Sequence, residues 1–318
     1  MLLPARAIPP PTTISEAARA ALATGAMTPA VTRPSSSDIE TWRSAVRASD
    51  LMWEPIAAQM LANYPCTVRT EVLAGVKSYI CTPSALSDAG HGGVYLYFHG
   101  GALVFGGGAF AAATGAKAAH QLNLKTISVD YRMPPEHPFP AAPQDCLAVY
   151  SELIRSHDPR QIVIGGSSAG GNLAAAVTLM IRDSGLPLPA AVILLTPEID
   201  LTEAGDTFQT NVLLDVTLKA GLPECNALYA AGHDLKDPYV SPLFGDFTRG
   251  FPPTFIQSGT RDLFLSNSVL IHRKLRHAGI EAELHVWEAM PHGGFGFGDV
   301  PENDEISQEI RRFIARHS

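Results

Sequence analysis

The chain has 318 residues, of which 46% are apolar and 17% are charged. This composition excludes a disordered chain and provides enough apolar surface for one large α/β domain or two ordinary domains. Acidic residues outnumber basic ones, 31 to 23, for a formal charge of −8, so neither nucleic acid nor an anionic membrane is expected as a partner.

The N-terminal region carries helical patterns and no strand pattern. Apolar periodicity predicts one helix over residues 14–23 and a stronger helix over residues 37–63, with Asp38 among its N-cap candidates. Because these helices precede every predicted strand, we expect residues 1–50 to form the N-terminal part of a cap. No window approaches the roughly 18 uncharged apolar residues of a membrane span, and prolines interrupt the apolar start. A secretory signal and a stable membrane association are therefore not expected.

The four cysteines are scattered through the chain without CxxC spacing. That pattern predicts reduced thiols and a cytoplasmic location, and it does not favour metal ligation.

From residue 66 onward, short apolar runs alternate with helical segments. Residues 67–72 and 77–81 flank a turn at Gly75 and predict an antiparallel pair. Strands that alternate with helices indicate right-handed crossovers, so an α/β fold with a mostly parallel sheet covered on both faces is expected. The other predicted strands are residues 93–98, 126–130, 161–164, 191–195, 254–257 and 283–287, and the other predicted helices are residues 111–122, 144–156, 170–183, 266–277 and 305–317.

The alternation is interrupted once, between Leu201 and about Pro252. A stretch of that length without a central strand is typical of an insertion. We therefore expect residues 202–250 to form the second part of the cap. Residues 51–201 and 251–318 then make up the core.

A serine stands where a predicted strand turns into a helix. The run Gly166-Ser167-Ser168-Ala169-Gly170 follows an apolar strand directly and matches the G-x-S-x-G pattern of a nucleophile elbow. Glycines two residues before and after Ser168 leave room for a sharp, strained turn, and Ser167 lacks that spacing. A phosphate-binding loop is disfavoured because no lysine follows, and a dinucleotide site would lie in the first βα unit. Ser168 is therefore the predicted nucleophile.

The run His99-Gly100-Gly101-Ala102 follows another predicted strand. It matches the HGGG-type element that lends backbone N–H groups to the oxyanion of an acyl-transfer intermediate. Ala102 stands in the place of the third glycine and keeps its N–H group. The predicted oxyanion hole consists of the N–H groups of Gly101, Ala102 and Ala169, in a loop shaped by Gly100 and His99.

The remaining catalytic groups are expected in the chain order serine, acid, histidine. His292 lies on a glycine-rich loop after the last predicted strand, where a base can reach back to Ser168. Asp262 follows the strand before it and is the predicted acid. Asp200 also follows a strand and is the main alternative, although a role as N-cap or cap anchor is expected for it. In the predicted mechanism His292 takes the serine proton and Asp262 orients the imidazole.

These motifs resemble the hormone-sensitive-lipase-like esterases (bacterial lipolytic family IV) of the α/β-hydrolase superfamily. The resemblance extends from about residue 65 to the C-terminus and includes the run DYRMPPEHPFPAA over residues 130–142, to which no chemistry is assigned. It implies an α/β-hydrolase fold with a helical cap, short-chain acyl substrates and frequent homodimers. Two residues depart from the family pattern: Ser167 stands where the family usually has Asp or Thr, and Ala102 replaces a glycine.

The leading hypothesis is a carboxylesterase that hydrolyses short-chain acyl esters through an acyl-enzyme, without cofactor or metal. An amidase, a lactonase or a deacetylase uses the same triad and stays an alternative. A non-catalytic small-molecule receptor, a class that the same family contains, is disfavoured because Ser168, Asp262 and His292 are all present. A metallohydrolase is disfavoured because the histidines form no H-E-x-x-H cluster. Bulky residues expected to line an enclosed acyl pocket are Phe105, Phe208, Leu213, Leu214 and Tyr229.

Overall fold

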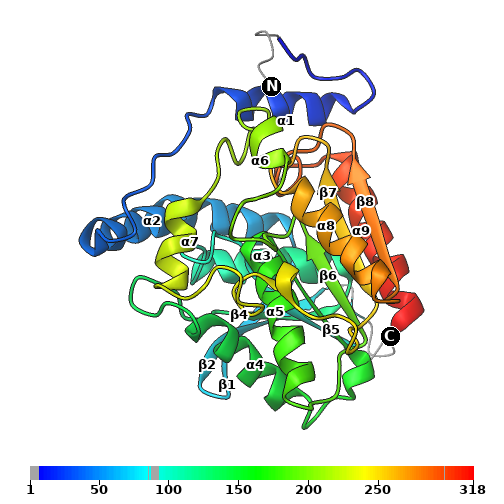
Figure 1. Ribbon diagram of the computed structural model, residues 1–318. Helices are drawn as coiled ribbons and strands as arrows, with labels where there is room; N and C mark the ends of the chain where they lie inside the picture. Colours follow the sequence, from blue (N-terminus) through cyan, green and yellow to red (C-terminus); the bar gives the residue numbers. More distant parts are fainter. Residues whose placement is uncertain (1–6, 85, 87–92, 297) are drawn as a thin grey trace.

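The computed structural model describes residues 7–84, 86, 93–296 and 298–318. Within these ranges eight strands form one sheet in the order β1-β2-β4-β3-β5-β6-β7-β8 (Figure 1). The pairs β1–β2 and β2–β4 are antiparallel, and every other neighbouring pair is parallel. The predicted α/β fold with a mostly parallel sheet is therefore confirmed. The strands are β1 (Cys66–Leu73), β2 (Val76–Pro83), β3 (Val94–Phe98), β4 (Lys125–Val129), β5 (Ile162–Ser167), β6 (Ala191–Leu195), β7 (Thr254–Gly259) and β8 (Ala282–Trp287).

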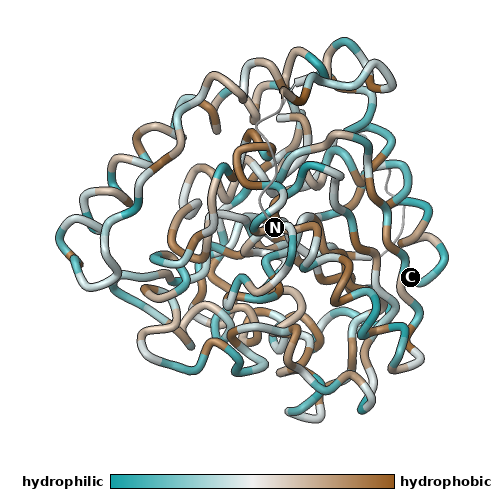
Figure 2. The backbone as a smooth tube through the Cα atoms, turned by 45° about the horizontal axis from the view of Figure 1, so that its top comes forward, coloured by the Kyte–Doolittle hydropathy of each residue, from teal (hydrophilic) through white to brown (hydrophobic). Residues whose placement is uncertain are grey.

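Helices cover both faces of the sheet, and alternate residues of β3 point to the two sides. Leu96 and Phe98 belong to the cluster that holds the buried residues of three helices on one face. Tyr95 and Tyr97 belong to a second cluster, on the other face. Figure 2 shows hydrophobic segments gathered in the interior of the molecule. The helices of the first face are α4 (Ala141–Leu153), α5 (Ala169–Asp183) and α8 (Leu265–His277), and those of the second are α3 (Ala109–Leu122) and α9 (Pro301–His317).

The N-terminal helix α1 (Glu16–Met27) is joined at its first turn to the first turn of α9. Its cap residue Ser15 accepts a hydrogen bond from the Ala18 N–H group. The Ser15 N–H and Oγ groups donate to the Glu302 carboxylate at 2.7 and 2.8 Å. Ala18 and Leu22 are buried in the cluster that contains the inner face of α9. Two segments nearly 290 residues apart thus form one unit.

Helix α2 (Ile39–Asn63) joins the N-terminal region to the insertion. It continues without a break past residue 50, so the predicted boundary at 50 falls inside a helix. Its Trp42 is fully buried in a cluster with Phe208 and Leu222 from the insertion and Phe105 from the loop after β3.

The insertion between β6 and β7 contains short helices and turns. The described residues include no strand between Leu195 and Thr254. Residues 211–218 form turns rather than a regular helix. No helix in the described ranges combines the length and the apolar character needed to cross a bilayer. The short elements are α6 (Thr207–Thr210), α7 (Pro223–Ala230) and the 3₁₀ helix η2 (Pro242–Phe244), and a further 3₁₀ helix, η1 (Pro159–Gln161), precedes β5.

Candidate active site

The predicted site residues lie at one edge of the sheet. Ser168 follows β5, Asp262 follows β7 and His292 follows β8. The loop that begins at His99 follows β3. Because these four strands are parallel, their carboxyl ends meet at the same edge, where open α/β sheets bind their ligands.

Ser168 occupies a sharp turn between β5 and α5. Its backbone has φ 58° and ψ −121°, a left-handed conformation that a non-glycine residue adopts only when the surroundings enforce it. The Ser168 N–H group donates to the Leu195 carbonyl oxygen at 2.8 Å, and the Ser168 carbonyl oxygen accepts from the Gly171 N–H group at 2.9 Å. Neighbouring backbone on both sides therefore holds the strained turn in place.

The two glycines of the elbow are required by close packing against the end of β3. A Cβ atom on Gly166 would lie 2.5 Å from the Phe98 carbonyl oxygen, and one on Gly170 would lie 1.9 Å from the same atom. Both distances are far below a van der Waals contact. The elbow and the loop after β3 can adjoin only because these side chains are absent.

We therefore expect Gly170→Ala to lower the free energy of unfolding by at least about 2 kcal/mol, because the added methyl group meets rigid backbone. Gly298→Ala is the matched control, since a Cβ there meets nothing within 4 Å, and its effect should stay within about 0.5 kcal/mol. Urea unfolding followed by circular dichroism measures both variants. Equal stability of the two variants would contradict the packing at the elbow.

The loop after β3 turns tightly beside the nucleophile. Gly101 has φ 133°, and a Cβ atom there would lie 2.1 Å from the Phe105 carbonyl oxygen. The Phe105 N–H group closes the turn by donating to the Gly101 carbonyl oxygen at 2.8 Å. A Cβ atom on Gly100 would lie 3.4 Å from the Ser168 Cβ atom. Gly100 and Gly101 thus bring the backbone close to the serine.

Two residues of the segment 130–142, to which we assigned no chemistry, hold this loop in place. The Tyr131 ring stacks on the His99 ring with 4.1 Å between centroids, and its hydroxyl donates to the His99 carbonyl oxygen at 2.7 Å. Burial lowers the pKa of His99, which favours a neutral ring at neutral pH. Asp130 accepts from the Gly108 N–H group at 2.9 Å, where α3 begins. Sequence alone could not show that Tyr131 and Asp130 contact residues of a loop that lie 32 and 22 positions earlier in the chain.

Asp262 and His292 lie in direct contact. The Asp262 Oδ1 atom is 3.0 Å from the His292 Nδ1 atom, and the exposed fractions of the two side chains are 0% and 6%. The other carboxylate oxygen accepts from the Ser258 hydroxyl at 2.6 Å, and Oδ1 also accepts from the Phe264 N–H group at 2.9 Å. These donors fix the carboxylate plane, so that it can hold the imidazole in one tautomer and orientation.

Asp200, the alternative acid, is satisfied within its own turn. It accepts from the Thr202 N–H group at 2.9 Å and from the Thr202 hydroxyl at 2.6 Å. Among the described residues no hydrogen bond joins Asp200 to a histidine. Its contacts are those of a turn-capping residue.

Ser168 and His292 both line a cavity of about 710 Å³ at this edge of the sheet. Gly100, Gly101 and Ala102 line the same cavity. Ala169, the other predicted donor, is fully buried at the first position of α5. The cavity therefore brings the predicted serine, base and oxyanion loop to one space. Its walls further include Met52 and Trp53 from α2, Thr114, Lys117 and Ala118 from α3, Ile306 and Ile310 from α9, and the strand residues Tyr95, Tyr97 and Gln257.

Residues 95–296 match the family model described as the alpha/beta hydrolase fold. The chain belongs to the α/β-hydrolase fold family. It is 32% identical to an acetyl-hydrolase of Streptomyces hygroscopicus over 215 residues, which cover 67% of this chain and 72% of that protein. It is 28% identical to an esterase of Acinetobacter venetianus over 243 residues, which cover 74% of this chain and 78% of that protein.

Solved structures of esterases superpose on nearly the whole length of this α/β hydrolase. The crystal structure of one esterase superposes with a TM-score of 0.91 at 34% identity and covers 100% of this chain and 98% of its own. An esterase from the bacterial hormone-sensitive lipase family superposes with a TM-score of 0.79 at 28% identity, covering 95% and 98%. The predicted resemblance to that family is confirmed.

The expected pocket lining of this α/β hydrolase is largely wrong. Phe105 lines the cavity, but the other four predicted residues do not. Leu213 is 70% exposed, Phe208 packs on Phe264, and Tyr229 is buried against the core beside Phe139. Leu214 also lies outside the lining. The physical reason is that bulk and apolarity, in an insertion of turns and short helices, do not determine which side a residue faces.

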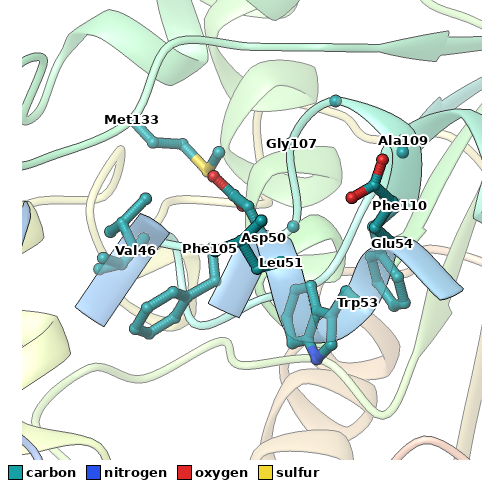
Figure 3. Close-up of a pocket in the computed structure, with 13 residues that line it drawn as sticks. Val46, Asp50, Leu51, Trp53, Glu54, Phe105, Gly107, Ala109, Phe110 and Met133 are labelled. Atoms are coloured by element: carbon teal, nitrogen blue, oxygen red, sulfur yellow. The ribbon is translucent and has the colours of Figure 1, made fainter. Parts of the chain in front are cut away.

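A second cavity, of about 330 Å³, lies between α2 and the loop after β3, and Figure 3 shows the residues that line it. Trp53, Phe105 and Phe110 line both cavities, with 4.4 Å between the ring centroids of Trp53 and Phe110. Asp50 and Glu54 project from α2 toward this second space. In the described part of the chain, no group of three or more His, Cys, Asp or Glu side chains could hold a metal ion.

Proposed function

We propose that this chain is a serine carboxylesterase that hydrolyses short-chain acyl esters. The observation that carries the proposal is the contact between the Asp262 Oδ1 and His292 Nδ1 atoms at 3.0 Å, on a cavity that His292 shares with Ser168. A buried carboxylate bonded to Nδ1 leaves Nε2 to act as a base toward a nucleophile. The names of the relatives, esterase, acetyl-hydrolase and carboxylic ester hydrolase, support an ester substrate.

In the proposed reaction the Ser168 oxygen attacks the ester carbonyl carbon while His292 takes its proton. Asp262 stabilises the imidazolium that forms, and the N–H groups of Gly101, Ala102 and Ala169 bind the oxyanion. The alcohol leaves with the proton from His292, and an acyl-enzyme remains. Water, deprotonated by His292, then releases the acid and restores the serine.

We further propose that residues 1–50 and 202–250 act together as a cap. The cluster around Trp42, which contains Phe208 and Leu222 from the insertion and Phe105 beside the site, supports this assignment. The cytoplasmic location and the homodimer expected from the sequence stay predictions. All four cysteines are free thiols in the structure.

The walls of the cavity that Ser168 and His292 line lead us to expect a limit on acyl length. Each buried methylene contributes about 0.8 kcal/mol until the chain meets a wall, after which further methylenes cost strain. With p-nitrophenyl esters of increasing length, kcat/KM should peak between acetyl and hexanoyl and fall steeply beyond about eight carbons. Efficient hydrolysis of a long-chain triglyceride emulsion, with a rate increase above the solubility limit, would show a true lipase instead.

The same assay separates the alternative acyl hydrolases. p-Nitroacetanilide presents the acetyl group of p-nitrophenyl acetate on an amide, so the pair differs only in the bond that is cleaved. We expect the ester to be hydrolysed and the amide to remain intact. A higher kcat/KM for the anilide would favour the amidase.

A further inference from the structure

A second buried carboxylate lies beside the Asp262–His292 pair. Asp215 belongs to the insertion, in the turns that follow α6, and its exposed fraction is 0%. None of the ion pairs among the described residues includes it. A buried carboxylate without a cationic partner is costly unless several donors compensate it.

Backbone N–H groups from three segments offset part of that cost. The Asp215 Oδ1 atom accepts from the N–H groups of Thr217 and Leu218 at 2.8 and 3.0 Å, within its own turn. The Oδ2 atom accepts from the N–H group of Leu263, the residue after Asp262, at 2.8 Å. The His292 N–H group lies 3.2 Å from Oδ2 and 3.3 Å from Oδ1. One side chain thus holds the insertion, the acid loop and the base itself.

A neighbouring side chain of the same turns holds the acid loop as well. The Asn211 amide donates to the Asp262 carbonyl oxygen at 2.9 Å and to the Thr260 carbonyl oxygen at 3.2 Å. The insertion therefore contacts the backbone on both sides of the Asp262 side chain. This arrangement transmits the position of the insertion to the acid and the base.

We propose that Asp215 is a positioning residue, which holds the backbone of Leu263 and His292 so that the Asp262–His292 pair stays aligned at the nucleophile. The proposal rests on the proposed esterase function. Asparagine at position 215 would keep the size of the side chain but lose its charge and one of its two accepting oxygens. The NH₂ group in place of that oxygen is a donor, and it would face backbone N–H donors with no acceptor between them. A shift of the imidazole of about 1 Å is enough to cost a large factor in turnover.

The first test compares Asp215→Asn with Asp200→Asn, a change at another buried carboxylate that accepts hydrogen bonds in a turn but contacts neither Asp262 nor His292 in the described structure. We expect kcat for p-nitrophenyl acetate to fall about 10- to 100-fold in Asp215→Asn, with KM changed less than about two-fold. The control should keep kcat within about two-fold of the wild type. Equal kcat values for the two variants would overturn the proposal.

The pH profile gives a readout that a purely structural role would not change. Burial raises the pKa of Asp215 to about 6, while the facing His292 lowers it and the facing Asp262 raises it. Above this pKa the ionised carboxylate accepts from all its donors, and below it the added proton removes accepting capacity. The wild-type to Asp215→Asn ratio of kcat should therefore be largest above pH 7 and approach one well below pH 6. A ratio independent of pH would contradict the proposal.

A third measurement does not depend on ester hydrolysis. The His292 Nδ1 proton bonded to Asp262 is expected as a downfield resonance in the proton NMR spectrum. It should broaden or shift in Asp215→Asn and stay unchanged in Asp200→Asn, whether or not the chain cleaves esters. If Asp215→Asn does not fold, Asp215→Glu keeps the charge but displaces it, and the same shift is expected. An unchanged resonance in a folded Asp215 variant would overturn the positioning role alone, whereas an inactive wild type with the expected shift would overturn only the esterase function.

Discussion

Ser168→Ala should reduce esterase turnover by roughly four to six orders of magnitude while the fold stays intact. The hydroxyl is the only side-chain group of the proposed mechanism that forms a bond to the acyl carbon, so no other residue replaces it. Alanine fits the turn because the left-handed backbone of Ser168 is held by neighbouring hydrogen bonds and not by its own hydroxyl. Turnover of p-nitrophenyl acetate and the thermal unfolding midpoint measure the two effects.

Ser167→Ala is the matched control for this variant. Ser167 is the last residue of β5, and its hydroxyl has no role in the proposed chemistry. Its loss should change kcat by less than about ten-fold. If Ser167→Ala were inactive and Ser168→Ala active, the register of the elbow would be wrong.

Asp262→Asn should lower kcat by about 10⁴-fold, because an amide bonded to Nδ1 favours the wrong imidazole tautomer. The amide would also oppose the Phe264 N–H group that now donates to Oδ1. KM should change little, since the carboxylate is buried away from the substrate. Steady-state kinetics at the pH optimum of the wild type gives both constants.

Asp200→Asn separates this role from that of a turn-capping carboxylate. Among the described residues its side-chain hydrogen bonds all come from Thr202, so the expected effect is a loss of about 1 kcal/mol of stability with kcat nearly unchanged. A large loss of kcat in Asp200→Asn, with Asp262→Asn active, would reverse the assignment of the acid.

The parts of the site that the sequence predicted are those that backbone geometry enforces. The Phe98 carbonyl oxygen lies so close to Gly166 and Gly170 that neither position can carry a side chain. Glycine is therefore required at both positions, and the sequence shows this as a fixed spacing around Ser168. The positions of the strands along the chain could be predicted for a related reason, since buried parallel strands are short continuous apolar runs. The preference for Asp262 over Asp200 stays a prediction, supported by the contact with His292.

The parts that could not be predicted depend on side-chain direction in irregular chain. Phe208 and Tyr229 have the bulk of pocket residues, yet both pack elsewhere, because they lie on the short helices α6 and α7, which are too short to show an apolar period that assigns a face. The role of Asp215 could not be predicted either. A single aspartate in a turn matches no sequence motif, and its role follows from the Leu263 and His292 N–H groups, which lie 48 and 77 residues away in the chain.

The pairing of Ser15 with Glu302 has a consequence for biosynthesis. At about 5 to 20 residues per second, the ribosome adds the 287 residues that separate the two partners in about 15 to 60 s. During that interval the hydrophobic cluster that buries Ala18 and Leu22 is incomplete, because its α9 residues have not been synthesised. Nascent α1 is therefore a predicted contact point for chaperones, and its N-terminus can pair with α9 only after Glu302 has been synthesised.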